Sequence, residues 1–300
     1  MAEAGGEFKS GFVSLIGRPN VGKSTLLNLL LGEKVAIISD KPQTTRNRIL
    51  GIKNLPAGQI IFLDTPGIHR ARSRLNQAMV RAALATYNEV DVVSFLIEAD
   101  RPDHEENDFI LETLKRVEKP VLLIINKIDL VPKGALLPVM DRYARARPFE
   151  QIIPISALRG DGVEVLVAEL LKLLPPGPKL FPEELLTDLP ERFLAGELIR
   201  EKIFQLTREE IPYATAVEID QFQERPEKNL VVIKATIQVE RESQKGILIG
   251  QNGRMLKEIG RQAREEMEAL LGTKVFLELF VKIERNWRED PRALRRLGFK

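Results

Sequence analysis

A glycine-rich segment near the start of the chain has the residue types and spacing of a phosphate-binding loop. Gly17-Arg-Pro-Asn-Val-Gly-Lys-Ser24 fits the pattern G-x-x-x-x-G-K-[ST] and lies between an apolar run at 12–16 and a helical segment at 25–31. In such a loop N–H groups point at phosphates, the lysine reaches the outer phosphates and the hydroxyl binds Mg²⁺. The predicted nucleoside triphosphate loop comprises Gly17, Arg18, Pro19, Asn20, Val21, Gly22, Lys23, Ser24 and Thr25.

A second motif addresses the base of the nucleotide. Asn126-Lys-Ile-Asp129 directly follows a buried apolar run at 121–125. The Asp129 carboxylate can accept hydrogen bonds from the ring N–H and amino group of guanine, whereas adenine would leave it unpaired at a cost of about 1–3 kcal/mol. Ser156-Ala-Leu158 ends the next strand, where N–H groups can support the guanine. The expected base contacts are Asn126, Lys127, Ile128, Asp129, Ser156, Ala157 and Leu158.

Two further segments carry groups suited to sensing a γ-phosphate. Asp64-Thr-Pro-Gly67 offers a carboxylate for the water shell of the metal and a glycine N–H for the γ-phosphate. In Gln43-Thr-Thr-Arg46 one hydroxyl is expected to join the metal only when the γ-phosphate is present, and Thr45 is favoured over Thr44. The predicted nucleotide contacts here are Asp64, Thr65, Pro66, Gly67 and Ile68, and the predicted metal ligands are Ser24, Thr45 and Asp64.

The elements that must position these groups follow from the hydrophobic pattern. Short apolar runs separated by helical segments predict βα units and a parallel sheet with both faces covered. The predicted strands are 12–16, 60–63, 92–97, 121–125 and 152–155. A closing helix is expected at 161–174 with Asp161 as its N-cap. Residues 8–174 therefore predict an α/β GTPase domain with a doubly wound, mostly parallel sheet.

This ordered set of motifs resembles the translation-factor-related class of GTPases over residues 10–174. Ras-like GTPases place a water-orienting glutamine after D-x-x-G, but this chain has Ile68, so slow intrinsic hydrolysis is expected. His69 is interpreted as a switch-loop residue without a chemical role rather than as a base. By analogy with similar GTPases, Asn20 is expected to help hold K⁺. The expected catalytic residues are Lys23, Thr45, Gly67 and Asn20.

The pattern changes after residue 174. Five prolines fall within 175–190, which predicts a linker. Beyond it, strictly alternating segments at 231–240 and 275–283 predict a sheet covered on one face only, and Val217 and Ile219 indicate a third strand. With helices at 191–209 and 253–271, the order is α-β-β-α-α-β. We expect a smaller α+β domain at 191–285 and a basic tail at 286–300.

Gly250-x-x-Gly253 lies between two helical stretches of this second domain. In that order of elements it resembles the I-G-x-x-G core of type II KH domains, whose glycines let the backbone clamp single-stranded RNA. One face of the following helix is basic, which favours phosphate contacts over a merely solvated face. Trp287 either stacks on a base or packs in the interior, and packing is favoured. The expected RNA contacts are Lys245, Ile249, Gly250, Gln251, Asn252, Gly253, Arg254, Lys257 and Arg261.

Composition restricts the remaining function classes. The 45 basic and 43 acidic residues give a net charge of only +2, so a nucleic-acid partner can be argued only from local clusters. Residues 1–190 contain 24 basic and 24 acidic groups, so the excess lies in the second domain. The chain has no cysteine and two histidines, which excludes disulfides and makes a zinc enzyme unlikely. No secretory signal is recognised, and no apolar run approaches the roughly 20 residues that span a bilayer, so a cytoplasmic protein is expected.

The two domains together resemble the Era family of bacterial ribosome-assembly GTPases over about residues 10–290. The resemblance implies GTP and GDP as ligands, Mg²⁺ as cofactor, and a monomer that binds the 3′ region of 16S rRNA and the 30S subunit. It also implies some peripheral association with the inner face of the cell membrane. Three alternatives stay open: an ATP-dependent kinase or ATPase, which N-K-I-D disfavours; an RNA-binding protein with a structural nucleotide site; and a GTPase in membrane-linked cell-cycle signalling.

Overall fold

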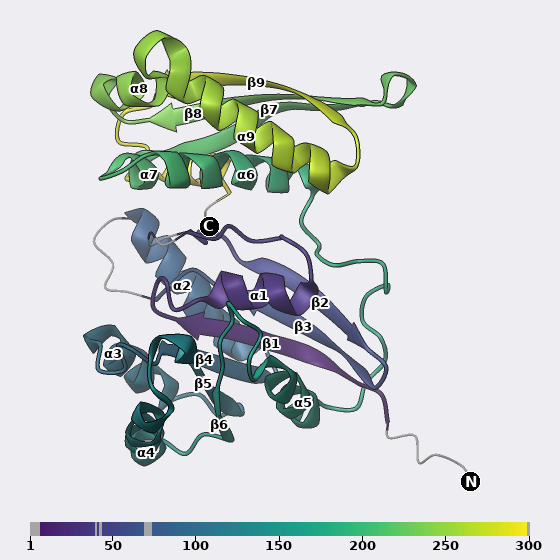
Figure 1. Cartoon of the computed structure of the whole chain (residues 1–300), viewed down its shortest axis with the longest axis vertical. Helices are drawn as coiled ribbons and strands as arrows, with labels where there is room; N and C mark the ends of the chain where they lie inside the picture. The colour runs from purple at the N-terminus through teal and green to yellow at the C-terminus, as the bar shows by residue number, and fades with distance from the viewer. Residues whose placement is uncertain (1–6, 40, 42–43, 69–73, 299–300) are drawn as a thin grey trace. The chain divides into compact units, whose positions relative to one another are not determined.

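The computed structural model describes residues 7–39, 41, 44–68 and 74–298. These residues form two compact units (Figure 1). The first takes most of the chain up to Asp188, and the second takes the chain from Leu189 onward together with two short earlier segments, around 37–44 and 73–75. Within the described ranges, no helix has the length and apolar character needed to cross a membrane.

The first unit is built on a six-stranded sheet with the strand order β2-β3-β1-β4-β5-β6 (Figure 1). All neighbours pair in parallel except β2, which is antiparallel to β3. Its elements are β1 (Lys9–Gly17), α1 (Lys23–Leu31), β2 (Ile49–Leu55), β3 (Gly58–Asp64), α2 (Arg74–Glu89), β4 (Val92–Glu98), α3 (Glu105–Leu114), β5 (Val121–Asn126), α4 (Leu136–Ala146), β6 (Gln151–Pro154) and α5 (Val163–Leu173), with 3₁₀ turns η1 (Ile128–Leu130) and η2 (Lys133–Ala135). This confirms the predicted α/β class and mostly parallel sheet.

Helices cover both faces of this sheet, which explains why its central strands are continuous apolar runs. Strands β3, β4 and β5 are buried along their whole length. One face packs against α2, α3 and α4, whose buried Tyr87, Ile110 and Tyr143 share a core with the strands. Helices α1 and α5 cover the other face. Leu27 of α1 lies against Gly51 of β2, and Leu171 of α5 lies against Gly58 of β3, so closely that a Cβ on either glycine would contact the leucine.

Two details of the first unit differ from the sequence predictions. Strand β2 (Ile-Leu-Gly-Ile-Lys-Asn-Leu) was missed because it is an edge strand in which Gly51, Lys53 and Asn54 interrupt the apolar residues, so its apolar pattern is weak. The closing helix α5 begins at Val163, and its N-cap is Gly162 in a left-handed conformation at φ 74° rather than Asp161. A Cβ at Gly162 would lie 2.5 Å from the Pro154 carbonyl oxygen, so this position requires glycine.

Most of the proline-rich segment is bound to the first unit and does not act as a free linker. Residues 175–188 belong to the first unit and bond to its strands. The buried side chain of Gln59 accepts hydrogen bonds from the N–H groups of Leu180 and Phe181, at 2.8 and 2.9 Å, and donates one to the Phe181 carbonyl at 2.8 Å. Ile52 on β2 also donates its N–H to the Leu186 carbonyl at 2.8 Å. The chain therefore leaves the first unit near 188–189, within the predicted 175–190 segment.

The second unit contains the three-stranded sheet β7-β8-β9, in which β7 pairs antiparallel and β9 pairs parallel with β8. Its elements are α6 (Glu191–Leu206), α7 (Ile211–Ala214), β7 (Ala216–Arg225), β8 (Leu230–Val239), α8 (Glu242–Ile249), α9 (Arg254–Leu271), β9 (Lys274–Ile283) and α10 (Pro291–Arg296), with 3₁₀ turns η3 (Pro226–Lys228) and η4 (Gln251–Gly253). The predicted α-β-β-α-α-β order is present, with α7 and α10 added.

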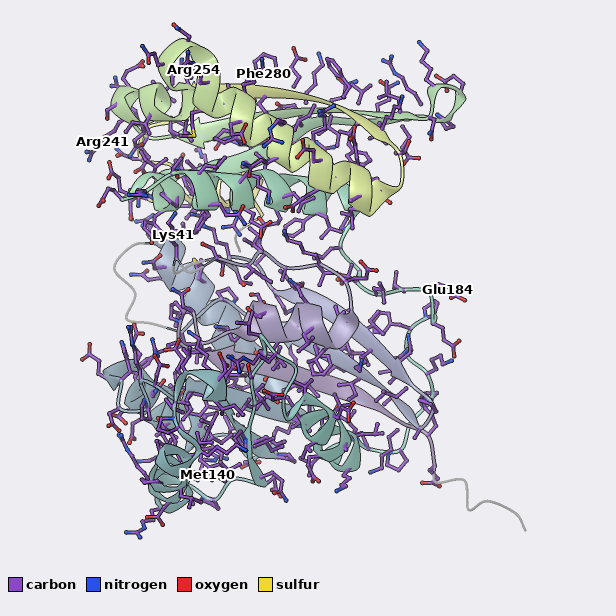
Figure 2. All side chains as sticks on the ribbon, in the orientation of Figure 1. Lys41, Met140, Glu184, Arg241, Arg254 and Phe280 are labelled. Atoms are coloured by element: carbon purple, nitrogen blue, oxygen red, sulfur yellow. The ribbon has the colours of Figure 1, made fainter. Side chains whose placement is uncertain are left out.

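One face of this small sheet is covered by helices. The inward residues of β8 pack with Ile199 and Ile203 of α6 and with Ile259 and Met267 of α9 in a single core. On the other face Phe280 is 49% exposed (Figure 2), as expected for a sheet covered on one side. Trp287 is fully buried and donates its indole N–H to the Ala214 carbonyl at 3.0 Å, so the structure supports packing rather than stacking on a base.

Candidate nucleotide and RNA-binding sites

The phosphate-binding loop joins β1 to α1 in the conformation that its glycines permit. Gly22 precedes the first turn of α1 with φ 97°, and a Cβ there would lie 2.3 Å from the Asn126 amide nitrogen. Asn20 also has a left-handed backbone, at φ 65°. Lys23 and Ser24 are the first two residues of α1 and are both buried. The loop therefore presents the N-terminus of a helix, a lysine and a hydroxyl, the groups that hold phosphate and its metal.

Three oxygen atoms from three separate segments meet beside this helix. The Ser24 and Thr45 hydroxyls lie 2.8 Å apart, and both donate to Asp64 Oδ2, at 2.8 and 3.2 Å. All three residues are buried, and within the described part of the chain Asp64 Oδ1 has no hydrogen-bond partner. Hydroxyl and carboxylate oxygens are ligands that Mg²⁺ prefers, so this donor set fits the ion. The structure brings Thr45, rather than the neighbouring Thr44, into the cluster.

Burial shifts the pKa values of the two charged groups in this cluster. Burial lowers the pKa of Lys23 to about 8, and the nearby Asp64 carboxylate only partly opposes the shift. Its ammonium donates to the Gly17 and Arg18 carbonyls at 3.2 and 3.1 Å. Burial likewise raises the pKa of Asp64, against the charge of Lys23 and the hydrogen bonds from Ser24 and Thr45. A phosphate and a cation would supply the missing counter-charges for both groups.

The base-recognition motif is tied to the phosphate loop. Asn126, the last residue of β5, donates its amide to the Val21 carbonyl at 2.7 Å and accepts the Ala157 N–H at 2.9 Å. Ser156 donates its hydroxyl to Asp129 Oδ1 at 2.6 Å, which fixes the orientation of that carboxylate. The predicted N-K-I-D and S-A-L segments are thus brought together at the carboxyl edge of the sheet, where ligands of doubly wound sheets bind.

The segment after β3 approaches the phosphate loop too closely for any side chain at Gly67. A Cβ there would lie 2.6 Å from the Pro19 nitrogen. Ile68, the next residue, is fully buried in the core of the first unit, and its N–H donates to the Gly17 carbonyl at 3.1 Å. Its side chain is apolar and offers no hydrogen-bonding group. His69 and Gln43 lie outside the described residues.

The predicted GxxG turn joins α8 to α9 through the short turn η4. Gly250, Asn252 and Gly253 all have positive φ, at 71°, 52° and 74°. A Cβ at Gly250 would lie 2.7 Å from the Met255 Cβ, so the turn requires glycine both for its backbone conformation and for space. Gln251 and Asn252 are exposed at the tip of the turn.

Cations on and beside α9 divide into two groups. Arg261 forms ion pairs with Glu258 and Glu265, at 2.6 and 2.7 Å, and is therefore already neutralised. Arg254 (Figure 2) and Lys257 are exposed, and neither has an ion-pair partner among the described residues. Among the cations of α9 itself, those without an ion pair therefore lie in the first turn, directly after Gly253, because Arg261 and Arg264 farther along the helix both have carboxylate partners.

One residue at the nucleotide site belongs to no motif. Glu98, the last residue of β4, is 4% exposed and forms ion pairs with both Arg18 and Lys127. The available sequence signal was an acidic residue directly after a buried strand, a position that resembles those of Asp64 and Asn126.

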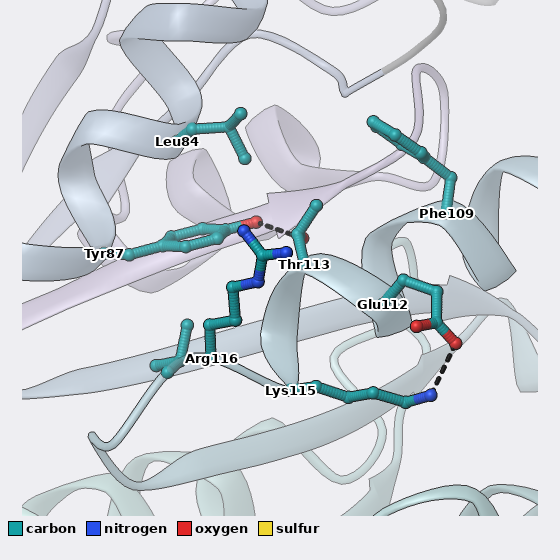
Figure 3. Close-up of a pocket in the computed structure, with 8 residues that line it drawn as sticks. Leu84, Tyr87, Phe109, Glu112, Thr113, Lys115 and Arg116 are labelled. Carbon is teal, nitrogen blue, oxygen red and sulfur yellow. Dashed lines mark hydrogen bonds and ion pairs between the residues drawn. The ribbon is translucent and has the colours of Figure 1, made fainter.

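A separate pocket of about 510 Å³ lies between α2 and α3, outside the predicted motifs (Figure 3). Leu84, Tyr87 and Phe109 supply apolar lining, while Lys115 is paired with Glu112 at 2.6 Å. It contains none of the residues predicted to bind nucleotide or RNA.

Comparison with known proteins covers both units. The family of 50S ribosome-binding GTPases matches residues 12–127, and the KH domain family matches residues 210–288. GTPase Era of Geobacter metallireducens is 60% identical over 292 residues, which are 97% of this chain and 98% of the relative. Aquifex aeolicus Era bound to GDP·AlF₄⁻ is 47% identical with a TM-score of 0.94, covering 97% of this chain and 99% of that one.

An Era structure in complex with MgGDPNP and nucleotides 1506–1542 of 16S ribosomal RNA is also 47% identical, with a TM-score of 0.95 and the same coverage. These likenesses extend over both domains and nearly the full length of each chain. The chain therefore belongs to the GTPase Era family.

Proposed function

We propose that this GTPase is a Mg²⁺-dependent guanine-nucleotide switch that binds the 3′ region of 16S rRNA and the 30S subunit during ribosome assembly. The observation that carries the proposal is that one chain presents the Ser24–Thr45–Asp64 oxygen cluster and also a glycine turn followed by unpaired cations. The related Era structure that holds MgGDPNP and 16S rRNA supports the same pair of ligands for this chain.

We assign the nucleotide contacts as follows. Ser24 and Thr45 ligate Mg²⁺, and Asp64 holds its water shell. The ion neutralises phosphate charge when bound. Lys23 contacts the outer phosphates and Gly67 offers its N–H to the γ-phosphate, so only a triphosphate orders both Thr45 and Gly67. Asp129 receives the guanine N–H groups, held in place by Ser156.

Intrinsic hydrolysis is proposed to be slow, with a potassium ion supplying part of the transition-state stabilisation. Ile68 cannot orient water because its side chain is buried in the core. Asn20 lies in the phosphate loop with a left-handed backbone, and we assign its side-chain oxygen to a K⁺ site. The test compares hydrolysis in KCl and NaCl at equal ionic strength for wild type and Asn20→Ala. Indifference of the wild type to the cation would refute the assignment.

For RNA, we propose that Gly250 and Gly253 let the backbone approach a single strand while Arg254 and Lys257 neutralise its phosphates. The decisive experiment measures binding to an RNA carrying the 3′ region of 16S rRNA, once with GDP and once with a non-hydrolysable GTP analogue. A switch requires affinities that differ between the two states. Equal affinities would show two independent binding activities and would favour the alternative of a structural nucleotide site.

We also infer a cytoplasmic monomer with peripheral association at the inner membrane face. The support is the membership of the Era family. Flotation with anionic vesicles in each nucleotide state measures the membrane association, and crosslinking in cells followed by sequencing identifies the bound RNA. Recovery of no 16S sequence would count against the ribosomal assignment.

A further inference from the structure

Glu98 occupies a place where two parts of the nucleotide site meet. It pairs in register with Asn126, the first residue of the base-recognition motif, because β4 and β5 are parallel neighbours. The Ala99 N–H donates to the Asn126 carbonyl at 2.8 Å, so the two strand ends are fixed to each other. A side chain at Glu98 therefore emerges at the same sheet edge as the guanine contacts.

The two oxygens of Glu98 are shared between two cations. Oε1 pairs with the Lys127 ammonium and Oε2 with the Arg18 guanidinium. Arg18 belongs to the phosphate-binding loop and Lys127 to the N-K-I-D motif, so one carboxylate joins the two motifs. The side chains of Arg18 and Glu98 are only 8% and 5% exposed, which keeps solvent from screening their pair.

Lys127 needs such an anchor because its backbone is unfavourable for lysine. Its φ of 64° lies in the left-handed region, which costs energy for a residue with a side chain. Burial also lowers the pKa values of Lys127 and Arg18, so both cations depend on a nearby anion. Without Glu98, the two cations would lose the carboxylate that contacts both of them, and only the charge of Asp100, which forms no ion pair with either, would still act on both.

We propose that Glu98 is a positioning residue for guanine nucleotides, holding Lys127 and Arg18 so that the base-recognition motif and the phosphate-binding loop keep one arrangement. This inference rests on the proposed nucleotide site and adds a residue that neither motif includes. Since the base and the first two phosphates are common to GDP and GTP, loss of Glu98 is expected to lower the affinity for both nucleotides by the same factor. That equality separates its role from that of Thr45, which responds only to the triphosphate.

The test measures the Kd of fluorescent GDP and of a fluorescent non-hydrolysable GTP analogue for the full chain. Glu98→Gln is expected to raise both Kd values about tenfold. Glu98→Asp keeps the charge and is expected to raise them by less. In a Lys127→Met background the same Glu98→Gln change is expected to cost less than threefold, because its partner is gone. Glu169→Gln removes a partly exposed carboxylate paired with Lys172 and serves as the matched control, expected to stay within twofold of wild type.

The results of these measurements distinguish the role of Glu98 from the proposed function. Wild-type affinity in Glu98→Gln, or an equal loss with and without Lys127, would overturn the positioning role while leaving the proposed function intact. A wild type that fails to prefer guanine over adenine nucleotides would overturn the proposed function and this inference together. If Glu98→Gln does not fold, as judged by circular dichroism, Glu98→Asp in the two backgrounds supplies the same comparison.

Discussion

Ser24, Thr45 and Asp64 illustrate what individual residues contribute to this site. Ser24 lies in the first turn of α1 and Asp64 ends β3, two elements that the hydrophobic pattern locates, so both could be predicted from their motifs. The choice between Thr44 and Thr45 could not be decided in the same way, because it depends on which side chain the irregular segment before β2 turns toward Asp64. In the structure the Thr45 hydroxyl lies 2.8 Å from that of Ser24, which supports the proposal that Thr45 is the metal ligand.

Thr45→Ala is expected to weaken binding of a GTP analogue by about tenfold while leaving GDP binding within twofold. The reason is that its hydroxyl is proposed to ligate Mg²⁺ only in the triphosphate state, and one lost polar contact to a charged group is worth about 1.5–3 kcal/mol. The measurement is a titration with each fluorescent nucleotide. Thr44→Ala is the neighbouring control, and a larger loss there would move the assignment to Thr44.

Gly67→Ala is expected to destabilise the first unit by about 1–3 kcal/mol, because the added Cβ would press on the Pro19 nitrogen at 2.6 Å. The free energy of unfolding from urea titration measures the change. Gly134→Ala is the control, since no atom lies within 4 Å of a Cβ at that position. Equal stability of the two variants would show that the phosphate loop moves away at little cost.

Helices and strands were predictable where one periodicity dominates, and less so where an element is exposed or short. The buried strands β3, β4 and β5 stood out as continuous apolar runs, whereas the edge strand β2 did not. Sequence spacing also placed Arg254, Lys257 and Arg261 on one helical face. It could not show that Glu258 and Glu265 neutralise Arg261, because that depends on side-chain conformations within α9.

For α9, Lys257→Gln is expected to weaken RNA binding several-fold and to reduce the dependence of log K on log salt by about one. Arg261→Gln is expected to have an effect below twofold, because its guanidinium is already paired with two carboxylates. Both are measured by titrating single-stranded RNA at several salt concentrations. A larger effect for Arg261 would mean that RNA displaces those carboxylates.

Tyr143 joins helix α4 to the loop before α3, because its hydroxyl donates a hydrogen bond to the Pro102 carbonyl at 2.7 Å. Tyr143→Phe is expected to cost about 1 kcal/mol at pH 7 through loss of this bond. Burial raises the pKa of Tyr143 to about 12, above the unfolded value near 10, so the unfolded state releases its proton first. The stabilisation by neutral Tyr143 is therefore complete below pH 10 and is lost as pH rises from 10 to 12.

The stability difference between wild type and Tyr143→Phe should consequently shrink, by about 1 kcal/mol per pH unit, above pH 10. Urea unfolding at pH 9 and pH 10.5 measures it. A difference that stays constant across this range would contradict the pKa direction.

For the molecule as a whole, charge and composition predicted two domains of different chemistry. The net charge of +2 hides a neutral first part and a second part that holds the basic excess. The prolines at 175–190 predicted a boundary, and the two compact units divide at Asp188 and Leu189, near the end of that segment. The prolines did not predict that residues 175–188 form hydrogen bonds with the first unit. The acceptor of two of these bonds is the side chain of Gln59, which lies more than a hundred residues earlier in the sequence.

Gln59→Leu is expected to destabilise the first unit by about 2–4 kcal/mol, since it leaves the Leu180 and Phe181 N–H groups without their acceptor. Release of this segment should also speed cleavage within 175–188 in limited proteolysis. Lys179→Gln, which alters only an exposed ion pair with Glu183, is the control. Unchanged cleavage in Gln59→Leu would show that other contacts suffice to hold the segment.

The buried Trp287 gives the protein a spectroscopic property of its own. It is the single tryptophan of the chain and lies wholly in the second unit, with its indole N–H bonded to Ala214. Excitation at the red edge of the absorption band will therefore report the environment of the RNA-binding domain alone, while far-ultraviolet dichroism reports both domains. Loss of the KH fold can thus be followed as a red shift in emission, without a label and without interference from the GTPase domain.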